Sequence, residues 1–418
     1  MTSQWRWRVL PALAATLVFS VIAALWLSGR HGAYFAILDL WHIEYYRFPF
    51  LDGKFVIDEL HCLRAGVDIY ADNNPCAEPF DYSPAWALLG RLPASVLTTA
   101  AFGFASAALF LGSLVLLPPA RDGRGAALIA AGALSTATVF ALERANIDVV
   151  VFAFTAAGVA LLCRGGARRY GGYVLILVAG LLKFFPLAAM AVALRETPGR
   201  LLALTAASLL VVCAFAVLTW PDLTRVMASV PPLTPFRRVF GASDISLAVQ
   251  ELGAPRIAGV ATMALASALA VGLGLRAGLN APAEVAIAAL RTDERTFLAA
   301  GGLIMLGCFF TAQNIDYRAI HLLLALPALA ALRTSPAGWR YRALVWMVLW
   351  LLWMDSVTSR LFELLGGAGL LVWLLREASW WWFATMLVAL LTAHFKDAPV
   401  IAFLMRRFSS TPLRAAGS

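Results

Sequence analysis

The run GGYVLILVAGLLKFFPLAAMAVAL, residues 171–194, has the length of a membrane-spanning helix but is interrupted at its centre by Lys183 and Pro186. Proline removes one backbone hydrogen bond of a helix and clashes with the preceding turn. A lysine in mid-membrane is costly unless it lines a polar cavity. The run therefore predicts one of two structures. One is a kinked spanning helix, and the other is a pair of half-helices that enter and return on the same side, which is allowed where protein or a water-filled cavity covers the irregular backbone.

The arginine-bearing gaps between the apolar runs favour the hairpin. Lys and Arg mark the cytoplasmic loops of membrane proteins. The gaps are residues 5–8, 118–125, 163–170, 195–200 and 333–342. One crossing by 171–194 would separate 195–200 from 163–170, whereas a hairpin keeps both on the cytoplasmic side. We therefore predict the hairpin, with Lys183 near its outer end.

The composition indicates an all-α polytopic membrane protein. Of the 418 residues, 61% are hydrophobic and 14% are charged, whereas soluble domains carry about a quarter charged residues. The net charge of +9 fits arginine-rich cytoplasmic loops, and no nucleic-acid partner is expected. Since about 20 apolar residues span a bilayer, we predict about 11–13 transmembrane or half-membrane helices. The apolar runs are 9–28, 95–118, 124–142, 147–163, 171–194, 200–219, 256–276, 296–312, 318–333, 341–357, 361–375 and 380–395.

Two polar excursions and a basic tail belong to this single membrane domain, residues 1–418. The excursions, 29–94 and 220–255, are predicted to be the first and second periplasmic loops, and 396–418 is the tail. The first loop contains an amphipathic stretch, FVIDELHCLRAG, which predicts a short helix that ends at Gly66. Cys62 and Cys76 also lie in this loop. They are expected either to form a disulfide in an oxidising compartment or to stay as two free thiols.

Four polar clusters fall on the outer side of the membrane in this topology. They are the acidic stretch 50–84, ALERANID (141–148), LLKFFP (181–186) and TAQNIDYRAIH (311–321). Each cluster lies at or near the end of an apolar run. A cavity open to the outside would therefore bring them together.

The clusters contain both acids and cations. A carboxylate near the membrane surface can deprotonate a hydroxyl group, although any one acid of the loop can instead solvate the loop or cap a helix. Lys183 requires a partner or an anionic ligand such as phosphate. Arg318 can bind phosphate through two hydrogen bonds or act as an interfacial anchor, and His321 shares its helix face. The segment 141–148 is either part of the same site or a plain connector.

No metal or nucleotide motif accompanies these clusters. The five histidines are scattered, and the sequence has no Asp-x-Asp pair, no His-x-x-His spacing and no glycine-rich nucleotide loop. We therefore predict no metal and no cofactor. A membrane-borne activated donor fits an outward-facing site better than a cytoplasmic nucleotide sugar.

These motifs, taken in order, resemble the membrane glycosyltransferases of the GT-C class. More narrowly, they are similar to the glycosyltransferase family 87 group, which includes polyprenyl-phosphate-mannose-dependent α-mannosyltransferases. The resemblance covers roughly residues 45–335 and departs from the family pattern at Ser83, where a proline is usual, and at Ala145, where a glycine is usual. The motifs are GVDIY (66–70), FDYSP (80–84), ERANID (143–148), LKFFP (182–186) and NIDYR (314–318).

The resemblance implies an inverting transfer of a sugar, usually mannose, from a polyprenyl-phosphate donor. The acceptor would be a glycolipid or glycan at the periplasmic face of a bacterial inner membrane. Asp52 matches the family's catalytic base best, and Asp58 is second. The donor phosphate would be held by Lys183, Arg318, His321 and Arg144. Further substrate-binding residues would be Glu143, Asn146, Asp148, Tyr82, Tyr317 and Asp316.

Two other functions compete with this one. Broken helices also occur in transporters, so a transporter or flippase of a lipid-linked glycan would explain Lys183 and Pro186. It would explain the acidic outer loop less well, and the sequence shows no inverted repeat. A non-catalytic membrane partner is the third hypothesis.

Overall fold

The computed structural model describes residues 3–43, 45–71, 74–76, 79–230, 234–236, 238–365 and 369–403. Residues 404–418 of the expected basic tail lie outside these ranges. Within them the fold is helical, apart from the short antiparallel pairing of β1 (Val239–Phe240) with β2 (Asn314–Ile315). The helices are α1 (Ser3–Leu27), α2 (His31–Leu40), α3 (Leu51–Arg64), η1 (Pro84–Arg91), α4 (Thr99–Ser113), η2 (Leu114–Leu116), α5 (Gly123–Ala133), α6 (Thr136–Glu143), α7 (Ile147–Arg164), α8 (Arg168–Leu182), η3 (Phe185–Arg195), α9 (Pro198–Leu218), α10 (Trp220–Ser229), α11 (Ala242–Glu251), α12 (Arg256–Gly278), α13 (Ala281–Ala288), α14 (Thr292–Thr311), η4 (Asp316–His321), α15 (Leu322–Leu332), α16 (Trp339–Leu365) and α17 (Gly369–Phe395).

Seven helices of the described chain are long and apolar enough to cross a membrane. They are α1, α4 with η2, α7, α9, α12, α14 and α17. The pair α5 and α6, bent by 44° at its break, gives an eighth span if it is counted as one. This confirms an all-α, multi-pass membrane protein, while the finer GT-C assignment stays a prediction.

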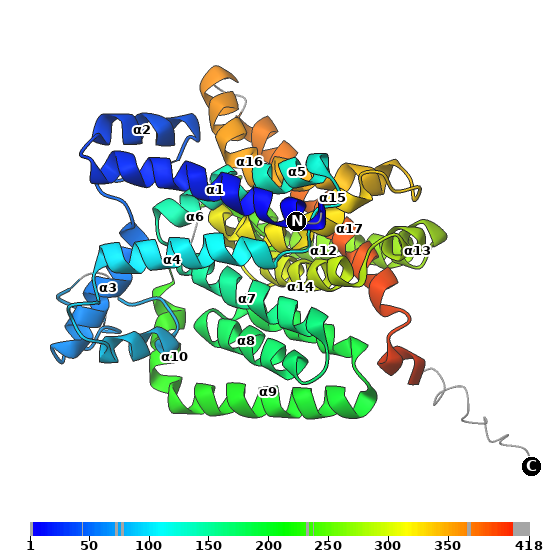
Figure 1. Ribbon diagram of the computed structural model, residues 1–418, viewed down its shortest axis with the longest axis horizontal. Helices are drawn as coiled ribbons and strands as arrows, with labels where there is room; N and C mark the ends of the chain where they lie inside the picture. Colours follow the sequence, from blue (N-terminus) through cyan, green and yellow to red (C-terminus); the bar gives the residue numbers. More distant parts are fainter. Residues whose placement is uncertain are drawn as a thin grey trace, which may run out of the picture.

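The long helices lie side by side around a buried centre. Figure 1 shows α1, α4, α7, α8 and α9 stacked with similar directions, and α12, α14 and α17 behind them. All residues of α15 (Leu322–Leu332) are buried, so this short apolar helix forms the middle of the core. In contrast, α9 has no buried residue and lies at the edge of the molecule.

The apolar run 171–194 forms a hairpin, as predicted. Helix α8 ends at Leu182, Lys183 adopts an extended conformation, and η3 runs back from Phe185. The two arms pack closely, because a Cβ atom on Gly180 would lie 2.4 Å from the side chain of Leu187.

The two ends of this hairpin meet. Glu196 follows η3 and accepts hydrogen bonds from Arg169 at 3.0 Å and from Tyr173 at 3.3 Å, both near the start of α8. The chain therefore returns to the side from which it entered, and the alternative of a single kinked spanning helix is wrong.

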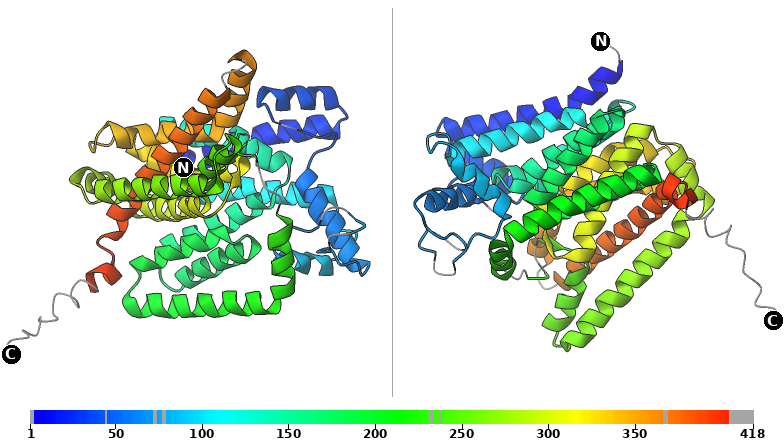
Figure 2. Two further views of the ribbon diagram at one scale, coloured as in Figure 1. Left: turned by 180° about the vertical axis from the view of Figure 1, so that it is seen from behind. Right: turned by 90° about the horizontal axis from the view of Figure 1, so that it is seen from below.

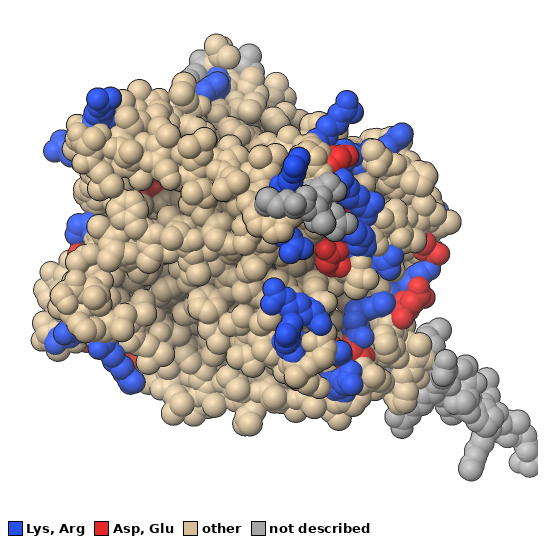
Figure 3. Space-filling model, viewed as in Figure 1, with Lys and Arg blue, Asp and Glu red and all other residues tan. Residues whose placement is uncertain are grey.

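The arginine-bearing gaps gather at one end of the bundle. Arg333 pairs with Asp122, and the ring of Trp7 lies against Gly123. At the end of the hairpin, Arg195 donates to the carbonyl oxygen of His394 at 3.1 Å. In Figure 3 the Lys and Arg side chains accordingly cluster toward one side of the face, with a broad area almost without charged side chains beside them.

The last part of the chain differs from the prediction. Three helices were expected at 341–357, 361–375 and 380–395, but the structure has two longer ones, α16 and α17. The polar residues Arg376 and Glu377, which suggested a gap, are buried within α17, and Arg376 donates to the carbonyl oxygen of Val239. The prediction was wrong because charged residues that are buried inside a helix have the same polar composition as a loop.

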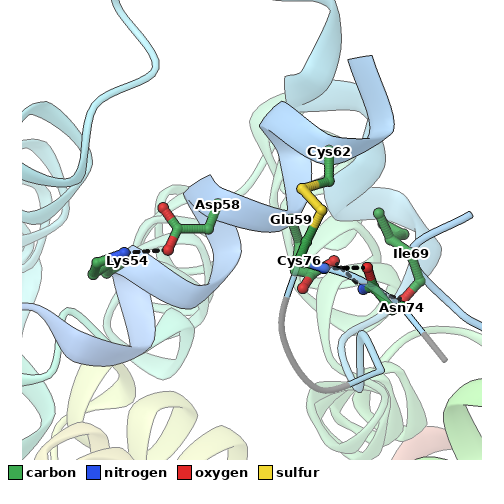
Figure 4. Close-up of a disulfide and its surroundings, with 7 residues drawn as sticks. All are labelled: Lys54, Asp58, Glu59, Cys62, Ile69, Asn74 and Cys76. Atoms are coloured by element: carbon green, nitrogen blue, oxygen red, sulfur yellow. Dashed lines mark hydrogen bonds and ion pairs between the residues drawn. A yellow bond between two sulfur atoms is a disulfide. The ribbon is translucent and has the colours of Figure 1, made fainter. Parts of the chain in front are cut away.

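The first polar excursion is largely helical and is closed by a disulfide. Helix α3 confirms the predicted amphipathic helix, and Cys62 is joined to Cys76 with a Cα–Cα distance of 6.4 Å (Figure 4). Asn74 donates to Glu59 at 2.7 Å beneath this bond. Burial raises the pKa of Glu59 above its ordinary value.

The second polar excursion lies at the same end as the first. Arg225 of α10 donates to Asp68 and lies over the ring of Tyr70. This hydrogen bond holds the pKa of Asp68 below its ordinary value. Figures 1 and 2 show α3 and α10 next to each other at one end of the long helices.

The contact between α7 and α8 gives a stability prediction. A Cβ atom on Gly172 would lie 2.6 Å from the carbonyl oxygen of Gly158, whereas one on Gly171 would make only an ordinary contact with Leu161 at 3.6 Å. We expect Gly172→Ala to destabilise the protein by about 1–3 kcal/mol through overpacking. Gly171→Ala should leave the stability unchanged or raise it slightly, because alanine favours a helix. Thermal unfolding in detergent checks both variants, and equal melting temperatures would contradict this packing.

Candidate functional site

The start of α3 is fixed to the turn between α6 and α7. The backbone N–H of Phe50 donates to the carbonyl oxygen of Glu143 at 2.7 Å, and that of Gly53 donates to the carbonyl oxygen of Arg144 at 3.1 Å. These bonds use backbone donors that the first turn of a helix leaves free. They place Asp52, which lies between Phe50 and Gly53, directly over the turn.

Both carboxylate oxygens of Asp52 accept hydrogen bonds from this turn. Arg144 donates from Nε at 2.8 Å, and Asn146 donates from Nδ2 at 2.6 Å. The guanidinium of Arg144 lies over the ring of Tyr46, 5.2 Å from its centroid, and near the ring of Phe140. The carboxylate is therefore held in one orientation at the edge of the bundle.

The backbone of the turn explains its sequence. Ala145 has a φ of +47°, in the left-handed region that favours glycine. Asn146 caps α7, because its side-chain oxygen accepts from the N–H of Asp148 at 3.0 Å. One asparagine thus starts α7 with its oxygen and holds Asp52 with its nitrogen.

Asp148 is fully buried and is shared by two cations. Its Oδ1 lies 2.9 Å from Nζ of Lys183, and its Oδ2 lies 3.4 Å from Nε of Arg318. Asp81 is a further electrostatic neighbour of Lys183. The bonds through Asn146 link this group to Asp52, so the four predicted polar clusters converge on one network.

The FDYSP segment holds the tip of the hairpin. Ser83 donates to the carbonyl oxygen of Leu181 at 2.6 Å, and the indole of Trp86 donates to that of Leu182 at 3.1 Å. These are carbonyl groups that the end of α8 leaves without helical partners. The ring of Tyr82 lies 6.0 Å from Nζ of Lys183. The first polar excursion therefore fixes the backbone immediately before Lys183.

The NIDYR segment supplies the other wall of the network. Arg318 donates to the side chain of Asn314 and lies over the ring of Phe185, and the ring of Tyr317 lies 5.8 Å from Nζ of Lys183. His321 is fully buried near the rings of Phe152 and Phe185. Neither of its ring nitrogens has a hydrogen-bond partner among the described residues.

Three of the predicted site residues lie apart from the network. Asp58 pairs with Lys54 on another side of α3, and both side chains are 42% exposed (Figure 4). The carboxyl group of Asp316 is buried and interacts with Asp355 and Arg376 instead of Asp148.

The third residue apart, Glu143, lines a separate cavity between α1 and α4. Its Oε1 lies 3.5 Å from the hydroxyl oxygen of Tyr34. Its backbone carbonyl still contacts the start of α3, so the cavity and the network are neighbours.

The sequence reasoning missed several positioning residues. Tyr46 stacks on Arg144, Asn314 accepts from Arg318, and Ser83 and Trp86 fix the end of α8. Of these residues, only Asn314 and Ser83 lie in the sequence motifs NIDYR and FDYSP. Arg376, a charged residue between the apolar runs 361–375 and 380–395, was the available signal for the buried acidic cluster around Asp316.

Comparisons with protein-family models, curated proteins and solved structures gave no match. The described residues include no group of three or more His, Cys, Asp or Glu side chains arranged to hold a metal ion. What the network offers chemically is one oriented carboxylate, Asp52, next to two cations that share a single buried anion.

The sharing of Asp148 gives a stability prediction. Asp148→Asn leaves Lys183 and Arg318 buried without their common counter-charge, and we expect a loss of about 3–5 kcal/mol. Adding Lys183→Met removes one of the two unpaired charges and should recover part of the loss. Asp58→Asn, at an exposed ion pair, should change the stability by about 0.5 kcal/mol or less.

Unfolding of these variants in detergent and denaturant measures the differences. Equal stability of Asp148→Asn and Asp58→Asn would contradict the shared buried charge.

Proposed function

We propose that the protein is a GT-C-type membrane glycosyltransferase that moves a sugar from a polyprenyl-phosphate donor to a hydroxyl group of a glycolipid or glycan. The network that joins Asp52, through Arg144 and Asn146, to Asp148, Lys183 and Arg318 is the observation that carries this proposal. A carboxylate base and a cationic phosphate site are the two groups that such a transfer needs.

Lys183 and Arg318 would bind the donor phosphate. Two cations share the buried carboxylate of Asp148, so a phosphate can bind beside it as a further anion. Arginine binds phosphate through two parallel hydrogen bonds, and lysine adds a point charge. Their effect increases in the transition state, because negative charge develops on the leaving phosphate.

Asp52 would act as the general base. It removes the proton from the acceptor hydroxyl while that oxygen forms a bond to the anomeric carbon. The bond from this carbon to the phosphate oxygen breaks, and polyprenyl phosphate leaves with the electron pair. Attack from the side opposite the phosphate inverts the anomeric centre. Arg144 and Asn146 orient the carboxylate through their hydrogen bonds.

The distribution of charge supports an outward-facing site. The arginine-bearing gaps lie at one end of the bundle, which the positive-inside rule assigns to the cytoplasm. Asp52 lies on α3 at the end that carries the two polar excursions. A donor carried by the membrane, already activated by its phosphate, reaches this end, and the inner membrane of a bacterium would provide it.

The first test compares two aspartates on the same helix. Asp52→Asn should lower transfer from a radiolabelled polyprenyl-phosphate sugar by about 10²–10⁴-fold, the usual contribution of a general base. Asp58→Asn should keep the activity of the unmodified protein, because Asp58 pairs with Lys54 away from the network. The assay uses purified protein in detergent, with folding checked by gel filtration. Full activity of Asp52→Asn, or no transfer by any variant in detergent, as for a flippase, would contradict the proposal.

The second test measures donor binding without catalysis. Farnesyl phosphate serves as a short-chain probe. Removing one charge-assisted hydrogen bond costs about 1.5–3 kcal/mol, so Lys183→Met should raise the dissociation constant by roughly ten- to hundredfold. Arg318→Lys should weaken binding less, because the charge remains but the paired geometry is lost.

Lys54→Met is the matched control for this binding test, since Lys54 pairs with Asp58 on the exposed side of α3. We expect it to bind the probe like the unmodified protein. If Lys183→Met and Lys54→Met bound farnesyl phosphate equally well, the phosphate site would lie elsewhere.

A further inference from the structure

A cavity of about 510 Å³ lies between α1 and α4 and reaches the end of α6. Its walls are almost entirely apolar, with Phe19 and Trp26 from α1, Leu111 from α4 and Val115 from η2. Both helices are candidate membrane spans with most of their surface outside the protein core. The cavity is of the size that proteins use for small ligands, about 300–1,000 Å³. Its walls suit a hydrocarbon chain that enters from the membrane.

The cavity has one polar end. Glu143 lines it with a side chain that is only 7% exposed, and its Oε2 has no hydrogen-bond partner among the described residues. Its other oxygen has a long contact of 3.5 Å with Tyr34, which also lines the cavity. A buried carboxylate oxygen without a donor is costly. A hydroxyl group at this end of the cavity would supply the missing hydrogen bond.

This polar end also lies next to the proposed base. The carbonyl oxygen of Glu143 accepts from the N–H of Phe50, two residues before Asp52. A lipid whose chain fills the cavity therefore presents its headgroup at the Asp52 side of the network. Lys183 and Arg318 lie on the other side of that network, with Asp148.

We propose that this cavity seats the hydrocarbon chain of a lipid-linked acceptor, with a headgroup hydroxyl on Glu143. This inference rests on the proposed function, since it assigns the acceptor's place in the same site. Glu143 can accept a hydrogen bond from a hydroxyl group, and none of the described residues that line the cavity is a lysine or arginine that could bind a phosphate. The two lipids are thus separated by the position of the cations: the phosphate of the donor goes to Lys183 and Arg318, and the hydroxyl of the acceptor goes to Glu143.

The test uses two photoreactive probes with the same chain. One is a farnesyl alcohol that carries a diazirine, and the other is the corresponding farnesyl phosphate. After irradiation of the full chain in detergent, mass spectrometry locates the labelled peptides. We expect the alcohol to label α1 and α4 around the cavity and the phosphate to label them weakly.

Two glycine variants test whether the label comes from the cavity. Gly112 lines the cavity and Gly272 lies on α12; a Cβ atom on either would have nothing within 4 Å. Gly112→Phe should fill the cavity and lower labelling by the alcohol about tenfold, which equals about 1.4 kcal/mol of binding. Gly272→Phe, an equally open position on another span, should leave this labelling unchanged.

Glu143→Leu tests the hydrogen bond at the polar end of the cavity. Leucine keeps an apolar volume but removes the acceptor, so labelling by the alcohol should fall. Glu143→Gln keeps a hydrogen-bonding oxygen and should be labelled like the unmodified protein. Labelling of the unmodified cavity by the phosphate as strongly as by the alcohol would overturn the assignment to an acceptor, and labelling by neither probe would overturn the lipid site.

Asp52→Asn separates this inference from the proposed function. Its labelling should equal that of the unmodified protein while its transfer activity is lost. If labelling follows the prediction but the unmodified protein transfers no sugar, only the proposed function fails. If transfer follows the prediction but Gly112→Phe leaves labelling intact, only the cavity assignment fails.

Discussion

The buried contact of Asp148 with Lys183 and Arg318 is the constraint on which the outer half of the fold depends. Two cations cannot stay in an apolar bundle without an anion, and the anion needs them equally. The contact joins the start of α7, the tip of the hairpin and the η4 segment, which are far apart in sequence. The N-cap at Asn146 then connects Asp148 to Asp52 and thus to the outer loop.

This contact offsets the free-energy cost of interrupting the helix at the tip of the hairpin. Lys183 interrupts an otherwise apolar run, and the carbonyl groups at the end of α8 lose their helical partners. Asp148 neutralises the lysine, and Ser83 and Trp86 donate hydrogen bonds to these carbonyl groups in place of helical N–H groups. The outer loop is therefore part of the membrane domain in physical terms, since the tip of the hairpin depends on it for hydrogen bonds.

The sequence was sufficient to predict the membrane class, the hairpin and the convergence of four polar clusters, because charges in apolar surroundings require partners. It ranked Asp52 before Asp58 only through the family resemblance, although positions six residues apart point about 120° apart around a helix and so do not both face the same turn. It also gave no sign of the bond from Ser83 to Leu181, since any hydroxyl can meet a carbonyl group and the partner lies 98 residues away. The segment that contains Arg376 and Glu377 was predicted as a gap between helices, because two adjacent charged residues occur in a loop more often than inside a buried helix.

The return of the hairpin to its own side also sets the sidedness of the rest of the chain. If residues 171–194 were counted as one crossing, each later loop would be assigned to the opposite aqueous compartment. Arg225 would then face away from Asp68, and Arg318 would be a bilayer thickness from Asp148, although the structure pairs them. A hydropathy count would add one crossing at residues 171–194. Because an odd or even number of crossings decides on which side a later loop lies, this single error would place the two halves of the chain in different compartments.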